Sequence, residues 1–132
     1  MRDIEFRGQE IEFGRYKTDK WIYGYFTGYY EDGNGCIQNS SPFIGNCVKV
    51  IPDTVGQFTG LKDKNGVKIF EGDILRYERE NHHNPFDPFI ELSSVEYKNG
   101  GFYLIPDEEC LYSGECLEVI GNIHDNPELL KA

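Results

Sequence analysis

Two short apolar runs, at residues 55–61 and 67–70, are separated by Asp63-Lys64-Asn65-Gly66. Asn-Gly is favoured in a two-residue hairpin turn of type I′, because both central residues of that turn need a positive φ. Glu71-Gly72-Asp73 follows, and a glycine between two carboxylates just before a β-prone run is typical of a sharp reversal into a strand. The segment therefore predicts strands at residues 55–60, 67–70 and 73–79.

The residues of this segment are similar to a known family signature. The matching pieces are TVGQFTGLKDKNG at residues 54–66, IFEGDI at residues 69–74, MRDIEFR at residues 1–7 and VIGNIHDNPELL at residues 119–130. On these pieces the chain resembles the YopX family of bacteriophage and prophage proteins, whereas residues 8–20 and 79–92 follow no matching pattern. The resemblance implies a small product of a phage genome with an SH3-like β-barrel in its C-terminal part. It implies no particular activity.

Composition favours a mainly β fold. The chain has 132 residues, including nine Tyr, nine Phe and 15 Gly. Aromatic side chains suit half-buried pleated surfaces, and Gly suits bulges and tight turns. Proline lacks an N–H and restricts the residue before it, so Pro52 marks a soft boundary. We expect an N-terminal β portion at residues 1–52 and the barrel at residues 53–132, either as two portions or as one compact unit.

Further strands are predicted on both sides of this boundary. They are expected at residues 3–7, 21–30, 36–38, 47–51, 89–97, 101–105 and 116–120. Gly24 and Gly28 are expected either at bulges or at places where another backbone approaches. Asn99-Gly100 predicts another hairpin. Asn126-Pro127 places a capping residue before a proline at the first helical position, which predicts one short helical turn at the C-terminal end.

Charge and hydropathy limit the classes of partner. The net charge is −10, with 16 acidic and 12 basic side chains in residues 1–98 against seven acidic and one basic in residues 99–132. A net negative charge repels phosphate backbones, so general nucleic-acid binding is disfavoured. Lys62, Lys64 and Lys68 are expected on a solvated hairpin tip. No apolar run approaches the ~18 residues of a membrane span, and no leader is evident. We expect a soluble protein in the cytoplasm of a bacterial host.

The four cysteines lack the spacing of a common metal site. Ten residues separate Cys36 from Cys47, and five separate Cys110 from Cys116, whereas common zinc sites contain C-x2-C pairs. In a reducing cytosol such cysteines are more often buried apolar residues than disulfides or ligands. We therefore expect buried, unpaired cysteines.

Residues 79–88 are expected to form a long exposed loop, because they contain two prolines and show no periodicity. Loops of this length are functional or mobile. The residues expected to make an interaction loop are His82, His83, Pro85, Phe86 and Asp87. His82, His83 and Asp87 also cluster imidazole and carboxylate groups, but a metal site needs three or four converging ligands. A metal-dependent hydrolase at residues 79–88 stays an alternative, and no cofactor is expected.

The strand predicted at residues 21–30 offers a second candidate surface. It contains Tyr23, Tyr25, Tyr29 and Tyr30, more aromatic side chains than one face of a short strand buries. An exposed aromatic strip commonly marks a protein interface, and core packing is the alternative. We expect self-association, either by pairing of edge strands or through this strip.

The sequence contains no arrangement typical of catalysis. Residues 56–60 lack the Lys-Ser/Thr ending of a P-loop. Glu71 and Asp73 fit either an acid–base pair or a turn that caps backbone N–H groups. We predict a non-enzymatic protein-interaction module that self-associates and whose partner is unknown. The acidic residues 99–132 leave open an acidic nucleic-acid-linked regulator or DNA mimic.

Overall fold

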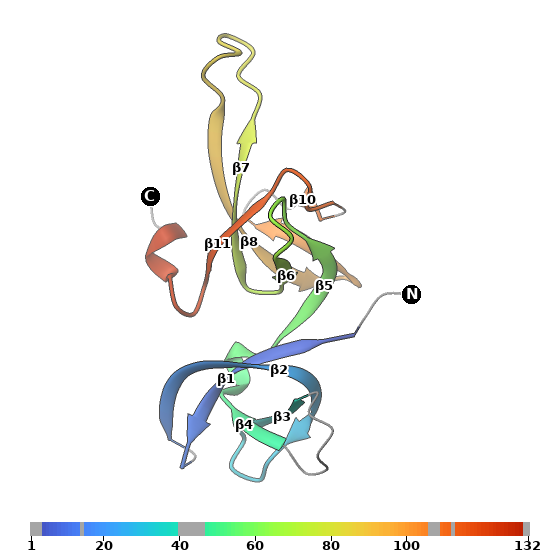
Figure 1. Cartoon of the computed structure of the whole chain (residues 1–132), viewed down its shortest axis with the longest axis vertical. Helices are drawn as coiled ribbons and strands as arrows, with labels where there is room; N and C mark the ends of the chain where they lie inside the picture. Colours follow the sequence, from blue (N-terminus) through green and yellow to red (C-terminus); the bar gives the residue numbers. More distant parts are fainter. Residues whose placement is uncertain (1–3, 14, 40–46, 106–108, 112, 131–132) are drawn as a thin grey trace. The chain divides into compact units, whose positions relative to one another are not determined.

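The computed structural model of the chain consists mainly of β-strands (Figure 1). It describes residues 4–13, 15–39, 47–105, 109–111 and 113–130. The elements are β1 (Phe6–Glu12), β2 (Tyr16–Tyr29), β3 (Gly35–Asn39), β4 (Cys47–Val50), the 3-10 turn η1 (Pro52–Thr54), β5 (Gly56–Lys62), β6 (Lys68–Phe70), β7 (Asp73–Arg79), β8 (Phe89–Lys98), β9 (Gly101–Ile105), β10 (Glu109–Cys110), β11 (Glu118–Asn122) and η2 (Pro127–Leu130).

The mainly β prediction is confirmed, and several predicted bounds agree with the structure. The strands predicted at residues 73–79 and 101–105 have those bounds, and the predicted helical turn is η2. The strand predicted at residues 3–7 instead runs from Phe6 to Glu12, because β1 continues into a hairpin with β2 in which Glu12 lies opposite Tyr16. Within the described residues, no helix is long and apolar enough to cross a membrane.

The chain divides into two compact units, residues 1–58 and 59–132. In the first unit the strand pairings close on themselves: β1 pairs with β2, β2 with β3, β3 with β4, and β4 with β1. Ile22, Ile37 and Val50 form its buried centre. Gly8 lets the strands approach closely, since a Cβ there would lie 2.9 Å from Val50 Cγ2. The boundary expected at Pro52 stays a prediction.

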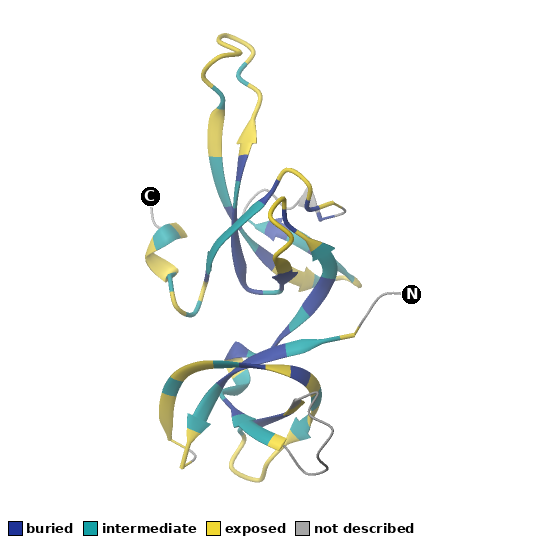
Figure 2. Cartoon of the chain, viewed as in Figure 1, coloured by how far each residue is buried: buried dark blue, intermediate teal, exposed yellow. Residues whose placement is uncertain are grey.

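The second unit contains a five-stranded antiparallel sheet in the order β10-β9-β8-β7-β11. Its core includes Leu75, Val95 and Phe102, together with Ile69 from β6. Figure 2 shows the buried residues at the base of β7 and β8 and the exposed residues toward their far ends. The centre of the sheet is therefore packed into the core, and the β7–β8 hairpin projects from it.

The two predicted Asn-Gly hairpins differ in turn type. Asn99 and Gly100 have φ values of 50° and 82°, as a type I′ turn requires. Gly66 has a φ of 81°, but among the described non-glycine residues only Phe13, Asp19 and Asn99 have a positive φ. The type I′ prediction for residues 65–66 is therefore wrong. The main-chain N–H of Asp63 donates to the Val67 oxygen, so three residues, 64–66, form the turn, and Asp63 Oδ1 accepts the N–H groups of Asn65 and Val67.

The expectation of unpaired cysteines is wrong for one pair. Cys36 of β3 and Cys47 of β4 form a disulfide, with Cα atoms 5.8 Å apart. The register explains this: Cys36 lies opposite Lys49 and Cys47 opposite Gln38, so the cysteines are diagonal neighbours on one face. Cys47 and the unpaired Cys116 are also exposed rather than buried.

Candidate functional site

The β7–β8 hairpin extends beyond the rest of its sheet and ends in the predicted loop (Figure 1). Its strands pair continuously from Ile74 opposite Ser94 to Arg79 opposite Phe89. At its base the Tyr77 hydroxyl lies 3.0 Å from Ser93 Oγ in the buried interior. The base thus fixes the direction of the hairpin, while the tip makes its own internal contacts.

Asparagine side chains give the loop a defined shape. Asn81 Oδ1 accepts the N–H of His83 at 3.0 Å, and Asn81 Nδ2 donates to the main-chain oxygen of Asp87 at 2.9 Å. Asn84 begins the next turn. Its main-chain oxygen accepts the N–H of Asp87, and its side-chain Oδ1 accepts the N–H of Phe86. Such Asx turns replace backbone pairing with side-chain acceptors. The loop is therefore built from two consecutive turns.

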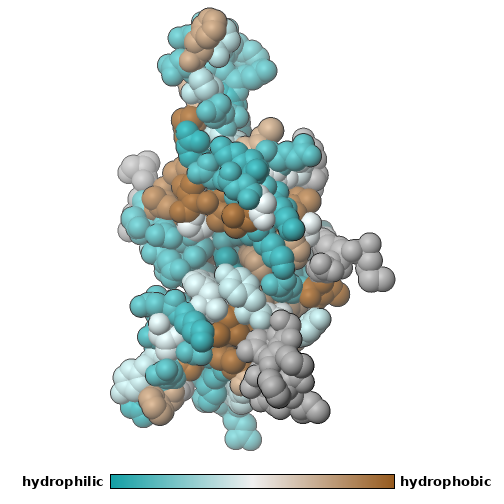
Figure 3. All heavy atoms as spheres, viewed as in Figure 1, coloured by the Kyte–Doolittle hydropathy of each residue, from teal (hydrophilic) through white to brown (hydrophobic). Residues whose placement is uncertain are grey.

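This loop presents Phe86 to solvent. The second turn has Asn84 at its first position and Pro85 at its second, the placement that a type I turn favours. Phe86 follows at the corner with 94% of its side chain exposed, more than any other large hydrophobic residue in the described part of the chain. The space-filling view shows hydrophobic surface among hydrophilic atoms at this tip (Figure 3). The five residues predicted for the loop, His82, His83, Pro85, Phe86 and Asp87, are all exposed.

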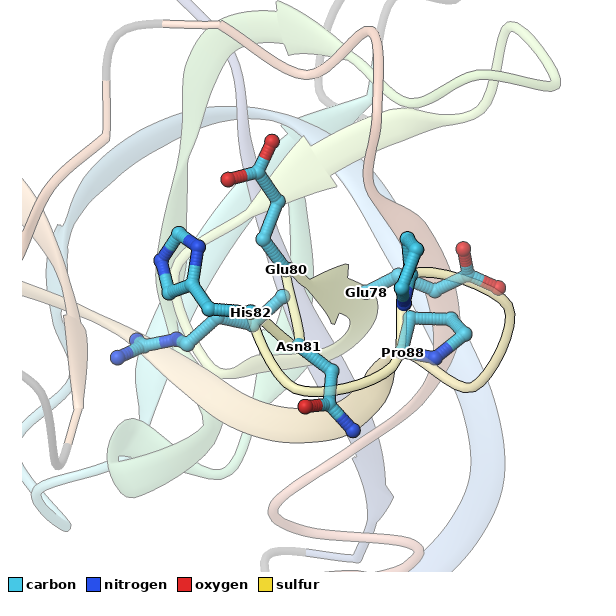
Figure 4. Close-up of a pocket in the computed structure, with 7 residues that line it drawn as sticks. Glu78, Glu80, Asn81, His82 and Pro88 are labelled. Atoms are coloured by element: carbon cyan, nitrogen blue, oxygen red, sulfur yellow. The ribbon is translucent and has the colours of Figure 1, made fainter.

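A hollow of 490 Å³ lies beside the loop (Figure 4). In Figure 4 the side chains of Glu78, Glu80 and His82 point in different directions, so these groups do not converge on one point. No three His, Cys, Asp or Glu side chains within the described ranges lie together as a metal site requires. The hydrolase alternative stays a prediction. The residues that line the hollow are Glu78, Arg79, Glu80, Asn81, His82, Pro85 and Pro88.

The predicted tyrosine strip is exposed, but its members do not share one face. Tyr23, Tyr25, Tyr29 and Tyr30 expose 45%, 58%, 70% and 38% of their surface, so none is a core residue. The bulge predicted at Gly28 is present, as a register shift between Phe26 and Gly28. It places Tyr29 opposite Gly35 and edge-on to the Phe26 ring at 5.2 Å, on the core side.

Two of the four tyrosines share the outer side of β2. Tyr23 and Tyr25 alternate with the buried Ile22 and with Phe26 along β2. Tyr30 donates its hydroxyl to Cys36 Sγ at 3.6 Å, and Lys49 Nζ lies 4.6 Å from the centre of its ring. Strand register thus places Tyr23 and Tyr25 on one face of β2, whereas Tyr30 follows the end of that strand.

The other predicted groups make structural contacts. Asp73 is buried and its Oδ2 accepts the Phe70 N–H at 2.7 Å, which supports the turn interpretation of the Glu71 and Asp73 pair. Of the three lysines predicted on the hairpin tip, Lys64 has its Nζ 3.2 Å from Glu118 Oε2. The acidic-regulator alternative rests on residues 99–132, of which 106–108, 112 and 131–132 lie outside the described residues, and it stays a prediction.

Asn81 and Asn84 are the residues of the loop that sequence reasoning missed. Asn84-Pro85 is a turn-initiation signal, and a second Asn precedes it by three residues. That spacing was available in the sequence. The hydrogen bond from Asn81 to Asp87 could not be predicted from the sequence, because it depends on where the two strands of the hairpin end.

Comparisons with known proteins agree with this architecture. The profile of a family described as YopX protein matches residues 15–131. The crystal structure of protein EF1440 from Enterococcus faecalis is similar with a TM-score of 0.61 and 24% sequence identity, over 99% of this chain and 100% of that one. At this identity the likeness shows the fold alone. No curated protein matches the chain.

Proposed function

Since this chain belongs to the YopX family, we propose that it is a small accessory protein of a bacteriophage or prophage that acts without catalysis, as a protein-interaction module that self-associates. We place its action in the cytoplasm of the bacterial host. The finer fold assignment, an SH3-like barrel in the C-terminal part, belongs to the same proposal. Its support is the succession of the β5–β6 hairpin, the tight turn at Gly72 and the antiparallel β7–β8–β9 strands.

The observation that carries the proposal is the exposed Phe86 on an ordered loop. Aromatic side chains are enriched among the few residues that dominate binding energy at protein interfaces. A loop that is already ordered loses less conformational freedom on binding than a flexible one. Since Asn81 and Asn84 fix the backbone on both sides of Phe86, the aromatic ring is presented at low entropic cost.

A pull-down from bacterial host lysate tests the proposal. The bait is the tagged wild-type chain, compared with Phe86→Ala and with Phe13→Ala as a matched control, since Phe13 is also a highly exposed phenylalanine, at 86%. Untagged copies of the chain are added to the lysate so that self-association is scored in the same experiment. We expect wild type and Phe13→Ala to retain a protein, either the untagged copy or a host partner, and Phe86→Ala to lose it. Equal recovery by all three baits would contradict the role of the tip.

A further inference from the structure

We infer that Cys47 is a site of reversible thiol exchange, at which a low-molecular-weight thiol attacks the Cys36–Cys47 disulfide and Cys36 is the leaving thiolate. The ligand class is a small thiol and the disulfide that it forms on oxidation. The site lies in the first unit and is independent of the proposed interaction loop. Three features carry it: the pairing of the two cysteines, their unequal exposure and the contacts of their sulfur atoms.

The two cysteines differ in exposure. Cys36 lies within β3 and is buried, with 6% of its surface exposed. Cys47 is the first residue of β4 and is exposed. Which sulfur of a disulfide is attacked by a thiolate depends on access to each of them. An incoming thiol therefore reaches Cys47 more readily than Cys36.

The surroundings of Cys36 suit a leaving thiolate. The Tyr30 hydroxyl donates to Cys36 Sγ at 3.6 Å. The ring of Tyr30 is held in turn, since Lys49 Nζ lies 4.6 Å from its centre and 2.9 Å from Asp32 Oδ2. Burial disfavours a thiolate, whereas a hydrogen bond to the charged form favours it. Tyr30 thus offsets the cost of placing the negative charge on the buried sulfur.

The hydroxyl beside the other sulfur has a competing acceptor. Thr27 Oγ1 lies 3.6 Å from Cys47 Sγ, and it also donates to the main-chain oxygen of Cys36 at 3.3 Å. A hydroxyl has one hydrogen to donate, so a thiolate on Cys47 would compete for it with a carbonyl oxygen. Exchange is faster when the leaving thiolate is more stable. Exposure and contacts therefore agree that Cys47 is attacked and Cys36 leaves.

The exchange uses only the small thiol as co-reactant. Its thiolate forms a bond to Cys47 Sγ while the bond between the two cysteine sulfurs breaks, and Cys36 Sγ keeps the electron pair. A second thiolate then attacks the small-thiol sulfur of this mixed disulfide, which releases the Cys47 thiolate and a small disulfide. In the reverse direction the small disulfide reacts first with Cys47, and Cys36 then closes the bond. The cross-link between β3 and β4 thus follows the redox state of the thiol pool.

Single-thiol variants test which cysteine is the entry point. Cys36→Ser leaves Cys47, Cys47→Ser leaves Cys36, and both variants lack the cross-link. Each is incubated with oxidised glutathione, and mass spectrometry of peptides measures how fast the remaining cysteine forms a mixed disulfide. We expect Cys47 to react at least about tenfold faster than Cys36 in the folded proteins and at a similar rate in denaturant. Equal rates in the folded proteins, a faster Cys36 or no mixed disulfide at either position would overturn the inference.

The wild-type protein gives the same test without a substitution. The oxidised protein is exposed briefly to reduced glutathione and quenched with an excess of a maleimide. We expect peptides that carry glutathione on Cys47 and the maleimide on Cys36. The opposite labelling, or equal amounts of the two patterns, would overturn the inference even if a single-thiol variant failed to fold.

Tyr30→Phe tests the donor beside Cys36. Loss of the hydroxyl should slow reduction of the disulfide by glutathione about threefold to tenfold, because the leaving thiolate loses a hydrogen bond. Looser packing alone would have the opposite effect, since it would expose the disulfide and speed its reduction. Tyr25→Phe is the control, because Tyr25 is an exposed tyrosine of the same unit. An unchanged or faster rate for Tyr30→Phe would overturn the role of Tyr30 in stabilising the Cys36 thiolate.

Discussion

Asn81 donates a hydrogen bond from Nδ2 to the main-chain oxygen of Asp87, 2.9 Å away across the loop between β7 and β8. Its Oδ1 accepts the N–H of His83 from the near side of the same loop. One side chain therefore holds both arms of the tip.

Replacing Asn81 with Ala separates tip order from overall stability. The Asn81→Ala variant loses these solvent-facing hydrogen bonds, so the free energy of unfolding falls by less than about 1.5 kcal/mol. Self-association weakens clearly, because Phe86 must then be ordered on binding. Denaturant titration measures the first effect and light scattering the second. Unchanged association would show that the tip does not need to be ordered beforehand.

Protonation of Asp63 at acid pH is expected to lower the stability of the second unit. Asp63 is buried, with 6% of the residue's surface exposed. Burial raises its pKa, but the N–H groups of Val119, Val67 and Asn65 outweigh this effect and hold the pKa below its ordinary value. The folded pKa lies below the unfolded one, so the stabilisation is fully present above the unfolded pKa of about 3.9 and is lost as the pH falls through the folded pKa.

The Asp63→Asn variant tests this contribution. An amide replaces one acceptor oxygen with a donor, which leaves a main-chain N–H unmatched and costs about 1–3 kcal/mol at neutral pH. The difference from wild type should shrink as the pH is lowered below about 4. Denaturant titrations at neutral and acid pH measure it, with the exposed Glu96→Gln as control. A difference that stays constant with pH would contradict the account.

The Cys36–Cys47 disulfide is expected to stabilise the first unit. It joins two residues that are 11 positions apart in the sequence. A cross-link that closes a loop of about this length lowers the entropy of the unfolded chain, which stabilises the folded state by about 2–3 kcal/mol. Adding a thiol reductant, or replacing both cysteines with Ser, should reduce the free energy of unfolding by that amount. Cys116→Ser is the control, because Cys116 is unpaired.

The oxidation state of Cys36 and Cys47 in host cells tests the proposed cytoplasmic location. Disulfides are rare in a reducing cytoplasm, so a protein acting there is expected to keep Cys36 and Cys47 as thiols until it is purified. Rapid alkylation of intact host cells, followed by mass spectrometry, reads the state of both cysteines. Two alkylated cysteines agree with a cytoplasmic location. A stable, fully oxidised pair in growing cells would contradict it.

Gly8 tests the packing of the first unit. A Cβ at this position would lie 2.9 Å from Val50 Cγ2 and 3.0 Å from Ile37 Cδ1. Gly8→Ala should therefore cost about 1–3 kcal/mol through overpacking. Gly101→Ala is the control, since its nearest neighbour would be 3.6 Å away. Equal melting temperatures for the two variants would show that the strands can move apart freely.

The sequence predicted local structure well, because turns and strands depend on nearby residues. Asn99-Gly100 and the strand at residues 73–79 are examples. The register with which the strands pair could not be predicted from nearby residues in the same way. The disulfide depends on the register of β3 with β4, and the separation of Tyr29 from Tyr23 and Tyr25 depends on one bulge at Gly28.

The most direct test of the central claim is a light-scattering dilution series of wild type beside Phe86→Ala and Phe13→Ala. The account predicts that wild type and Phe13→Ala have a mass above the 15.2 kDa of one chain at micromolar concentration, and that Phe86→Ala stays close to that mass. A wild type that remains at the mass of one chain throughout the series would contradict the claim.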